Sequence, residues 1–297
     1  MDDLLSSVQS ITLTGYIILT MLAMGMKLAL PQIGRTFKRT RLIVMSLLAN
    51  LIIVPAAAWI ALRLFDDLPT NAVIAIVLLA SAPGYAPIMS ARSHGDLPFS
   101  TTLIFLLSAV SVVTIPVTAT ILFAGEAAVE IDSWSIVQTL LLYQLIPLGL
   151  GMAFRKGREE QAEGFAPRLG TLAQVSVGVA VLTYLIDLVR DDGTPLLDMG
   201  WQSFVAWAAI TAVALASGYV GGGPKESARR TLSLHTAIRN VGVSLLVASK
   251  SFPDMGAEIG LLALAVVMYP MAMALMFRWE REPIESSEPI KSSEPTV

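Results

Sequence analysis

Residues 81–87 read Ser-Ala-Pro-Gly-Tyr-Ala-Pro and lie inside an apolar window, residues 68–91, that carries no charged side chain. Two prolines and a glycine this close together remove helical hydrogen bonds, so the window is not one regular helix. In a lipid bilayer, such an interruption is tolerated only where protein or a cavity covers the freed backbone groups. The segment therefore predicts a helix that is either kinked or unwound at its centre.

Similar apolar windows recur along the whole chain of 297 residues, which is 55% hydrophobic and only 14% charged. A soluble domain carries about 25% charged residues, and a helix needs roughly 20 apolar residues to cross a bilayer. Eight windows without charged residues or histidine are near 18 residues or longer: 4–26, 42–62, 68–91, 97–125, 133–154, 169–186, 199–224 and 259–277. A ninth, 231–249, is interrupted by His235 and Arg239. We therefore predict an all-α membrane protein with nine transmembrane helices in one domain, residues 1–280.

The composition also argues against several classes of function. The chain has no cysteine, two histidines and a net charge of −3, so we expect no metal centre or other cofactor and no nucleic-acid partner. We find no HExxH motif, no paired intramembrane aspartates and no Ser–His relay at helical spacing in the sequence, which speaks against an enzyme.

The distribution of lysine and arginine predicts the orientation of the chain. Of the 20 basic residues, 16 lie in alternate loops on one side, 3 lie on the other, and Arg239 lies within a window. The positive-inside rule makes the richer side cytoplasmic. We therefore expect a multi-pass protein of the plasma (inner) membrane, with the N-terminus outside and the C-terminus in the cytoplasm. Residues 281–297 are polar and repetitive, and we expect a disordered cytoplasmic tail.

A second interruption lies in the stretch 231–242, Thr-Leu-Ser-Leu-His-Thr-Ala-Ile-Arg-Asn-Val-Gly. His235 and Arg239 are four residues apart and share a helix face. A charge at this depth is costly and by default indicates a function. The alternative is an arginine neutralised by an acid, with Asp187 and Asp96 as candidates. His235 is interpreted as a neutral, hydrogen-bonded histidine or as a site of proton coupling.

The two interruptions occupy corresponding places, each in the helix before the last of its half. Interrupted helices at matching positions are typical of transporters built from inverted repeats, with the binding site at the midplane. We assign a first repeat of four helices to about residues 4–125 and a second of five helices to about residues 133–279.

Four motifs in this order resemble the bile acid:sodium symporter (BASS) family, over nearly the whole chain to about residue 279. The motifs are Gly25-Met26; Asn50 followed by Pro55 and Trp59; Ala82-Pro83-Gly84 followed by Gly95-Asp96; and Arg230-Thr-Leu followed by Arg239-Asn240-Val-Gly242. The resemblance implies a panel domain packed against a core domain in which two broken helices cross. It also implies secondary active transport of organic anions, usually with sodium.

In this resemblance, windows 68–91 and 231–249 are the crossing helices. Windows 42–62, 97–125, 199–224 and 259–277 complete the core, and windows 4–26, 133–154 and 169–186 form the panel.

Several positions that bind sodium in the family are substituted. The Ser-Asn pair after the first break falls near Ile88 and Met89, with Ser90 next, and a downstream Ser/Thr pair becomes Ser100 and Ile104. The carboxylate of the second crossing helix becomes His235 and its glutamine becomes Arg239, whereas the polar position in window 42–62 is kept as Asn50. Because hard cations prefer oxygen ligands, the sequence makes sodium binding doubtful. We expect Arg239 to replace the bound cation as a fixed positive charge, or to attract an anionic substrate directly.

The predicted function is therefore a secondary active transporter of an organic anion, working by alternating access, with the lipid bilayer and a small organic anion as its partners. Two alternatives stay open: a sodium-independent transporter, proton-coupled or facilitative, and a non-transporting sensor on the same fold. The predicted binding residues, with no metal ligand among them, are Asn50, Pro83, Gly84, Tyr85, Pro87, Ser90, Ser100, His235, Thr236, Arg239 and Asn240.

Overall fold

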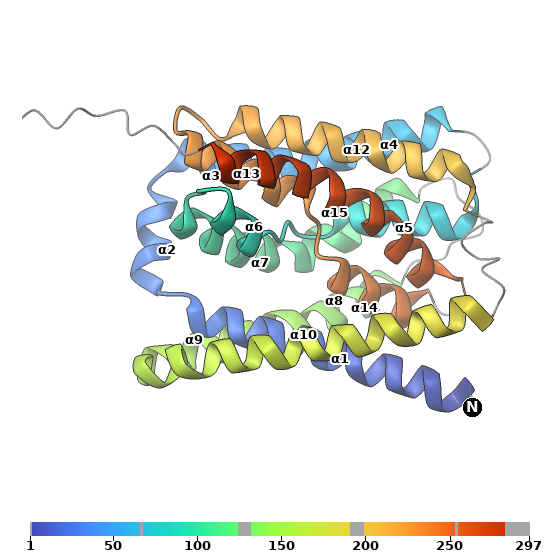
Figure 1. Ribbon diagram of the computed structural model, residues 1–297, viewed down its shortest axis with the longest axis horizontal. Coiled ribbons are helices and arrows are strands. Elements are labelled where there is room, and N and C mark those ends of the chain that lie inside the picture. Colours follow the sequence, from blue (N-terminus) through green and yellow to red (C-terminus); the bar gives the residue numbers. More distant parts are fainter. Residues whose placement is uncertain (1, 66–67, 124–131, 191–198, 253–254, 283–297) are drawn as a thin grey trace, which may run out of the picture.

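The computed structural model describes residues 2–65, 68–123, 132–190, 199–252 and 255–282, without the side chains of residues 2–4, 187 and 188. The described ranges are almost entirely helical (Figure 1). In chain order the α-helices are α1 (Asp2–Lys27), α2 (Leu30–Phe37), α3 (Thr40–Leu48), α4 (Val54–Leu64), α5 (Thr70–Ser81), α6 (Pro87–Arg92), α7 (Leu97–Leu122), α8 (Ser133–Leu140), α9 (Ile146–Gly157), α10 (Glu159–Arg190), α12 (Gly200–Gly221), α13 (Glu226–Ala237), α14 (Val241–Ser251) and α15 (Ala257–Arg281). Two π-helical turns, η1 (Ala49–Ile53) and η2 (Leu141–Leu145), join α3 to α4 and α8 to α9.

Among the described residues, seven helical segments are long and apolar enough to span a membrane: Leu5–Lys27, Thr40–Leu64, Leu97–Leu122, Ser133–Gly157, Glu159–Ile186, Gly200–Gly221 and Ala257–Arg281. Two apolar helices, α5 and α14, are shorter, and both belong to interrupted windows. The chain is thus an integral, multi-pass membrane protein.

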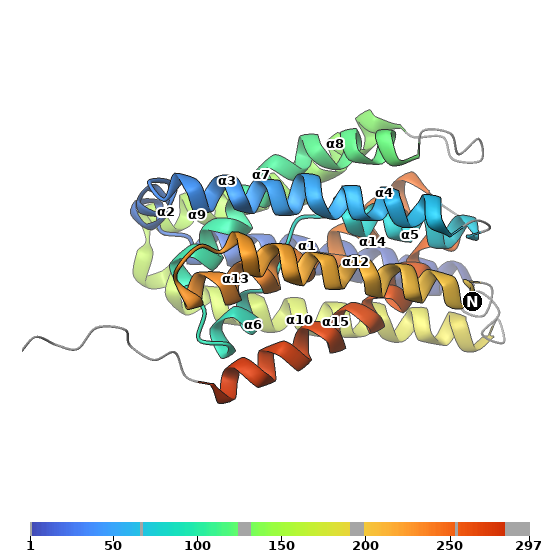
Figure 2. The ribbon, with the colours of Figure 1, turned by 90° about the horizontal axis from the view of Figure 1, so that it is seen from above.

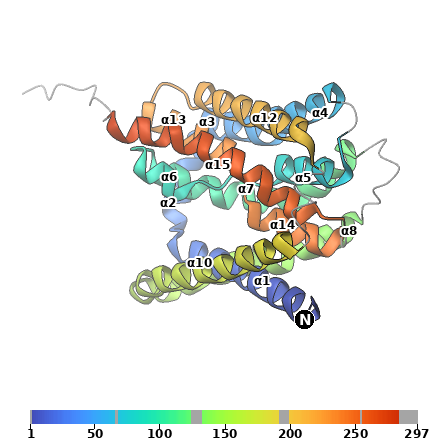
Figure 3. The same cartoon turned by 45° about the vertical axis from the view of Figure 1, so that its right-hand side comes forward.

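Helices α1, α9 and α10 pack together as one layer, and the other long helices lie mainly on one side of it (Figures 1 and 3). Glycines allow α1 and α9 to meet backbone to backbone. A Cβ atom added to Gly25 would lie 2.1 Å from the carbonyl oxygen of Leu148, and one added to Gly151 would lie 2.3 Å from that of Leu22. Small residues at such contacts are typical of helix packing in membranes. Seen from above, α12 and α15 run beside each other in the second layer (Figure 2).

Both predicted interruptions are complete breaks of the helix rather than kinks. Residues 82–86 separate α5 from α6, and residues 238–240 separate α13 from α14. The two unwound segments cross and pair: the N–H of Tyr85 donates to the carbonyl oxygen of Ile238 (2.8 Å), and the N–H of Asn240 donates to that of Pro83 (2.9 Å). Each break thus satisfies the backbone groups that the other one frees.

Gly84 makes this crossing possible. It pairs with Arg239 in an isolated antiparallel bridge, and a Cβ atom at Gly84 would lie 1.8 Å from the carbonyl oxygen of His235. No side chain fits into that space, because the obstacle is backbone rather than the end of a flexible side chain. The Pro-Gly pair therefore both ends the helix and admits the opposing chain.

Two stretches that the sequence analysis treated as loops are helical. Helix α2 lies within the predicted loop 27–41, and its residues Ile33 and Thr36 face inward whereas Arg35 faces outward. Helix α13 begins at Glu226, ahead of the predicted window 231–249. Both are amphipathic, so a search for charge-free windows passes over them. Of the predicted tail, residues 281–297, only Arg281 and Glu282 belong to the described residues, and Arg281 ends α15.

Candidate functional site

The guanidinium of Arg239 lies at the crossing of the two breaks, where the side chain is 1% exposed. Its Nε donates to the carbonyl oxygen of Leu79 (3.1 Å), and one Nη donates to that of Ala80 (2.9 Å) and, at 3.5 Å, to that of Asn50. The other Nη donates to Oδ1 of Asn50 (2.8 Å) and to the carbonyl oxygen of Thr236 (3.2 Å). All five N–H groups of the guanidinium therefore have an oxygen acceptor.

These acceptors come from the ends of the broken helices. Leu79 and Ala80 belong to the last turn of α5, and Thr236 belongs to the last turn of α13. The C-terminal end of a helix carries a partial negative charge, because its last carbonyl groups lack N–H partners. Arg239 thus occupies a position where two such ends converge, which is a site suited to a cation.

Within the described residues, no carboxylate bonds to Arg239. Asp96, one of the two acids considered as a partner, instead accepts from Nη1 of Arg39 at 2.6 Å and caps α7 at the N–H of Phe99. The side chain of Asp187, the other candidate, lies outside the described residues. The positive charge of Arg239 is therefore compensated by neutral oxygen dipoles in the part of the site that the structure describes.

Besides the ends of α5 and α13, Asn50 is the third source of acceptors for the guanidinium of Arg239. It lies in the π-helical turn η1, is 1% exposed, and its Nδ2 donates to the carbonyl oxygen of Ser46 (2.9 Å) and to Oγ1 of Thr236 (3.3 Å). Since both amide hydrogens are occupied, the amide oxygen is oriented toward Arg239. π-Helical turns are frequent at functional sites, where they redirect a side chain.

His235 is fully buried one helical turn before Arg239. Its Nε2 lies 2.7 Å from Oγ of Ser100 on α7, and its Nδ1 accepts a long hydrogen bond from the N–H of Ala86 (3.4 Å). Because Nδ1 is an acceptor, the hydrogen-bond pattern assigns the neutral imidazole with its proton on Nε2. His235 therefore links the first break to α7.

Of the remaining predicted residues, some lie at the crossing of the two breaks and the others lie in α6. Asn240 caps α14 through Oδ1, which accepts from the N–H of Val243, and Tyr85 is the half-buried member of the crossing. Pro87 begins α6, and Ser90 is buried in α6 with a hydroxyl that bonds to none of the described residues. Hydrogen bonds between described residues connect Asn50, Pro83, Tyr85, Ser100, His235, Thr236, Arg239 and Asn240 to the crossing, and Gly84 pairs there through its backbone.

Residues 14–188 match the family model described as the Sodium Bile acid symporter family. The chain belongs to this family. The match includes the first break and Asn50 but ends before α13 and Arg239. No curated protein matches the chain. Membership in a family of symporters places this multi-pass membrane protein among transporters rather than enzymes.

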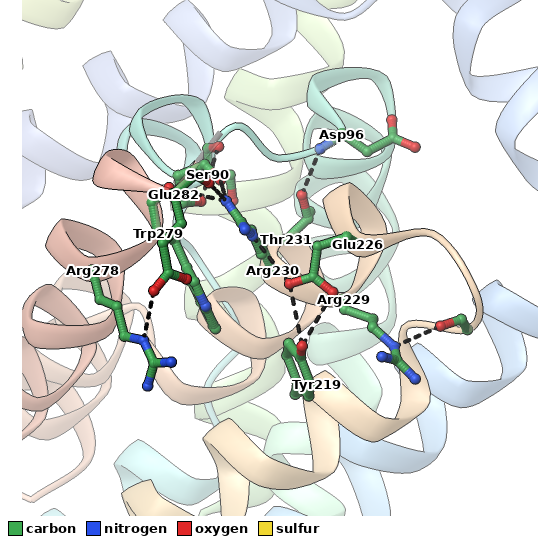
Figure 4. A network of polar contacts seen from close by, with 12 residues as sticks. Ser90, Asp96, Tyr219, Glu226, Arg229, Arg230, Thr231, Arg278, Trp279 and Glu282 are labelled. Atoms are coloured by element: carbon green, nitrogen blue, oxygen red, sulfur yellow. Dashed lines mark hydrogen bonds and ion pairs between the residues drawn. The ribbon is translucent and has the colours of Figure 1, made fainter. Parts of the chain in front are cut away.

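This family member has a second buried arginine, which the sequence analysis counted among the loop residues. Arg230 on α13 is 4% exposed, and its Nη1 donates to the carbonyl oxygens of Trp279 and Glu282 (both 2.9 Å) at the end of α15. Its Nε donates to Oε1 of Glu226 at 3.1 Å, and Glu226 also accepts from the hydroxyl of Tyr219 (Figure 4). The Nη1 of Arg230 also donates to the carbonyl oxygen of Ser93 (3.3 Å), so Arg230 ties α13 to the ends of α6 and α15 near one end of the bundle.

Proposed function

We propose that this member of the family is a secondary transporter of a small organic anion that works by alternating access and does not depend on sodium. In this proposal, the guanidinium of Arg239 takes the place of a bound cation between the ends of the two broken helices. The observation that carries the proposal is its set of five hydrogen bonds, all to neutral oxygens. A bound sodium ion would need similar oxygen ligands.

The proposed architecture has nine crossings in inverted repeats of four and five helices, about residues 4–125 and 133–279. The panel consists of α1, α8–α9 and α10, and the remaining long helices form the core around the two crossing breaks. The packing of α1, α9 and α10 as one layer supports this division (Figure 3). The distribution of basic residues supports an orientation with the N-terminus outside and the C-terminus in the cytoplasm.

The geometry favours a structural role for Arg239 over direct contact with the substrate. Its N–H groups are fully used, so a carboxylate would have to displace a helix-end carbonyl to bind it. Tyr85 is the better candidate for substrate contact, because it is the one described residue of the unwound segments 82–86 and 238–240 that is not buried. We propose that the anion binds beside Tyr85, in the positive field of Arg239.

Transport in liposomes tests the proposal. A thermal-shift screen of bile acids and shorter carboxylic acids, run in sodium and in choline buffer, identifies a ligand for the purified protein. We expect saturable uptake of that ligand, accelerated by preloaded ligand and unchanged when sodium is replaced by choline. Strong stimulation by sodium would contradict the replacement of the cation by Arg239. A ligand that binds without counterflow would instead identify a sensor.

The double variant His235→Glu and Arg239→Gln tests whether a sodium site can be recreated where Arg239 is proposed to replace the cation. It restores the residue types that the family resemblance places at these two positions. We expect sodium chloride to raise the melting temperature of this variant relative to choline chloride, and to leave that of the original protein within about 1 °C. Single Arg239→Gln is the matched control, since it lacks the added carboxylate. Equal responses of the two variants to sodium would show that no cation site has been recreated.

A further inference from the structure

A basic pocket of about 480 Å³ lies between the turn before α3 and the turn after α12. Its size is within the range of small-ligand sites. Four of its ten lining residues are basic and none is acidic: Lys38, Arg39, Thr40, Arg41, Leu42, Gly221, Gly222, Gly223, Pro224 and Lys225. The pocket is separate from the Arg239 site, with which it shares no residue.

Three of the four positive charges in this pocket lack a carboxylate partner in the described part of the chain. Arg39 is paired with Asp96 at 2.6 Å, whereas Lys38, Arg41 and Lys225 are exposed and form no ion pair with a described residue. Like charges gathered in one concave site repel each other, and an anion relieves that repulsion. The pocket therefore favours a ligand with at least one negative charge.

Apolar side chains continue from the pocket along both membrane-spanning helices. Arg41, Val44 and Leu48 follow one face of the segment that begins with α3, and the last two are 44% and 41% exposed. On α12, Val220 is 75% exposed and Val213, two turns earlier, is 42% exposed. Along both helices, exposed apolar residues thus begin directly beside the residues that line the charged pocket.

The two helices meet at the mouth of this pocket. A Cβ atom at Gly221 would lie 3.5 Å from Cβ of Met45, so the end of α12 packs directly against α3. The chain then turns sharply at Gly223, which has a φ of +78° and so favours glycine. This turn places Lys225 opposite the basic residues before α3.

We propose that this pocket binds the headgroup of an anionic phospholipid, with the phosphate held by Lys38, Arg41 and Lys225. Lysine supplies compact point charges, and arginine adds two parallel donors that match phosphate oxygens. The acyl chains lie along the exposed apolar faces of α3 and α12. Basic pockets between membrane helices are suited to such headgroups. The inference is independent of transport and of the role of Arg239.

Lipid binding to the purified, delipidated full chain in detergent tests this inference. The probes are dioctanoyl phosphatidylglycerol, dioctanoyl phosphatidylcholine with the same chains but no net charge, and glycerol 1-phosphate without chains. We expect saturable binding of phosphatidylglycerol, read as a rise in melting temperature, and at least tenfold weaker binding of the other two. The triple variant Lys38→Gln, Arg41→Gln, Lys225→Gln is expected to weaken binding roughly 100-fold, at about fivefold per charge.

The matched control variant is Lys156→Gln, Arg158→Gln, Arg168→Gln, which removes three exposed charges at α9 and α10 on the same predicted side of the membrane. It is expected to bind phosphatidylglycerol as the original chain does. An equal loss in this control, or equal binding of phosphatidylcholine, would overturn the proposal. Glycerol 1-phosphate binding as tightly as the lipid would also overturn it, in favour of a free anion. If the triple variant does not fold, Lys225→Gln alone must weaken binding about fivefold.

Discussion

Arg230 in α13 and Arg239 in the break that follows α13 are both almost completely buried. Both also donate to carbonyl oxygens at the end of a helix: Arg230 to the end of α15, and Arg239 to the ends of α5 and α13. They differ in their counter-charge. Arg230 has Glu226 at 3.1 Å and the ring of Trp279 beside it, whereas the described partners of Arg239 are all neutral.

This difference separates two uses of a buried arginine. At Arg230, a carboxylate offsets the charge and the hydrogen bonds clamp three helices, so the residue contributes to structure. At Arg239, neutral dipoles alone offset the charge, and in the proposed mechanism the field of this charge attracts the anion toward the crossing. Burial alone does not distinguish the two, but the identity of the acceptors does.

The largest expected effect comes from Arg239→Leu. The substitution removes five hydrogen bonds and leaves the oxygens of Leu79, Ala80 and Asn50 without these donors. Since each buried unsatisfied group costs about 1–3 kcal/mol, we expect a loss of at least about 3 kcal/mol in the free energy of unfolding. Thermal unfolding in detergent measures the loss. Arg239→Lys, which keeps the charge but has three donors, is expected to lose less, and a leucine variant as stable as the original would contradict the model of the site.

Arg230→Gln is expected to have a smaller effect, about 2 kcal/mol, because a glutamine amide still offers two donors to the end of α15. Arg230 has no described bond to the crossing, so ligand uptake in liposomes is expected to persist once the variant has folded. Arg229→Gln serves as the control, since its described hydrogen bond is a single one, to the carbonyl oxygen of Gly223. Loss of transport in a stable Arg230→Gln variant would show that the two arginines do not differ as we infer.

Ser100→Ala is expected to have the smallest effect, about 1 kcal/mol, because it removes the hydroxyl 2.7 Å from Nε2 of His235. The variant tests whether the contact between Ser100 and His235 contributes to the stability of the site around Arg239. The matched control is Ser203→Ala, whose buried hydroxyl has one hydrogen bond among the described residues, to the carbonyl oxygen of Met199 just before its own helix. Equal melting temperatures of the two variants would show that the contact of Ser100 with His235 adds nothing.

Hydropathy located the long apolar helices, the Pro-Gly pair marked the first interruption, and His235 and Arg239 marked the second. These signals are local: a run of apolar residues indicates burial in lipid, and proline lacks the N–H that a helix requires. The helical parts at α2 and Glu226–Arg230 were missed for a related reason. Their charged faces interrupt the hydropathy signal, although their other faces pack against the bundle.

Among the binding residues, the sequence singled out Arg239 and His235 through the cost of placing charged or polar groups in a membrane. It did not indicate that Arg239 would meet the carbonyl oxygens of Leu79 and Ala80. Every residue type has a backbone carbonyl group, so the identity of a residue does not reveal whether its carbonyl oxygen is a ligand. Arg230 likewise looked like a loop cation, because the end of α15 that buries it lies 49 residues further along the chain.

Composition and local pattern alone were thus enough to identify a membrane protein with two interrupted helices and a charge in one of them, since each of these properties resides in neighbouring residues. The crossing of the breaks and the neutral acceptors of Arg239 emerge when segments 160 residues apart come together. Packing in three dimensions selects which oxygens face each guanidinium, and that selection gives Arg230 a carboxylate partner beside its carbonyl acceptors and gives Arg239 neutral acceptors alone.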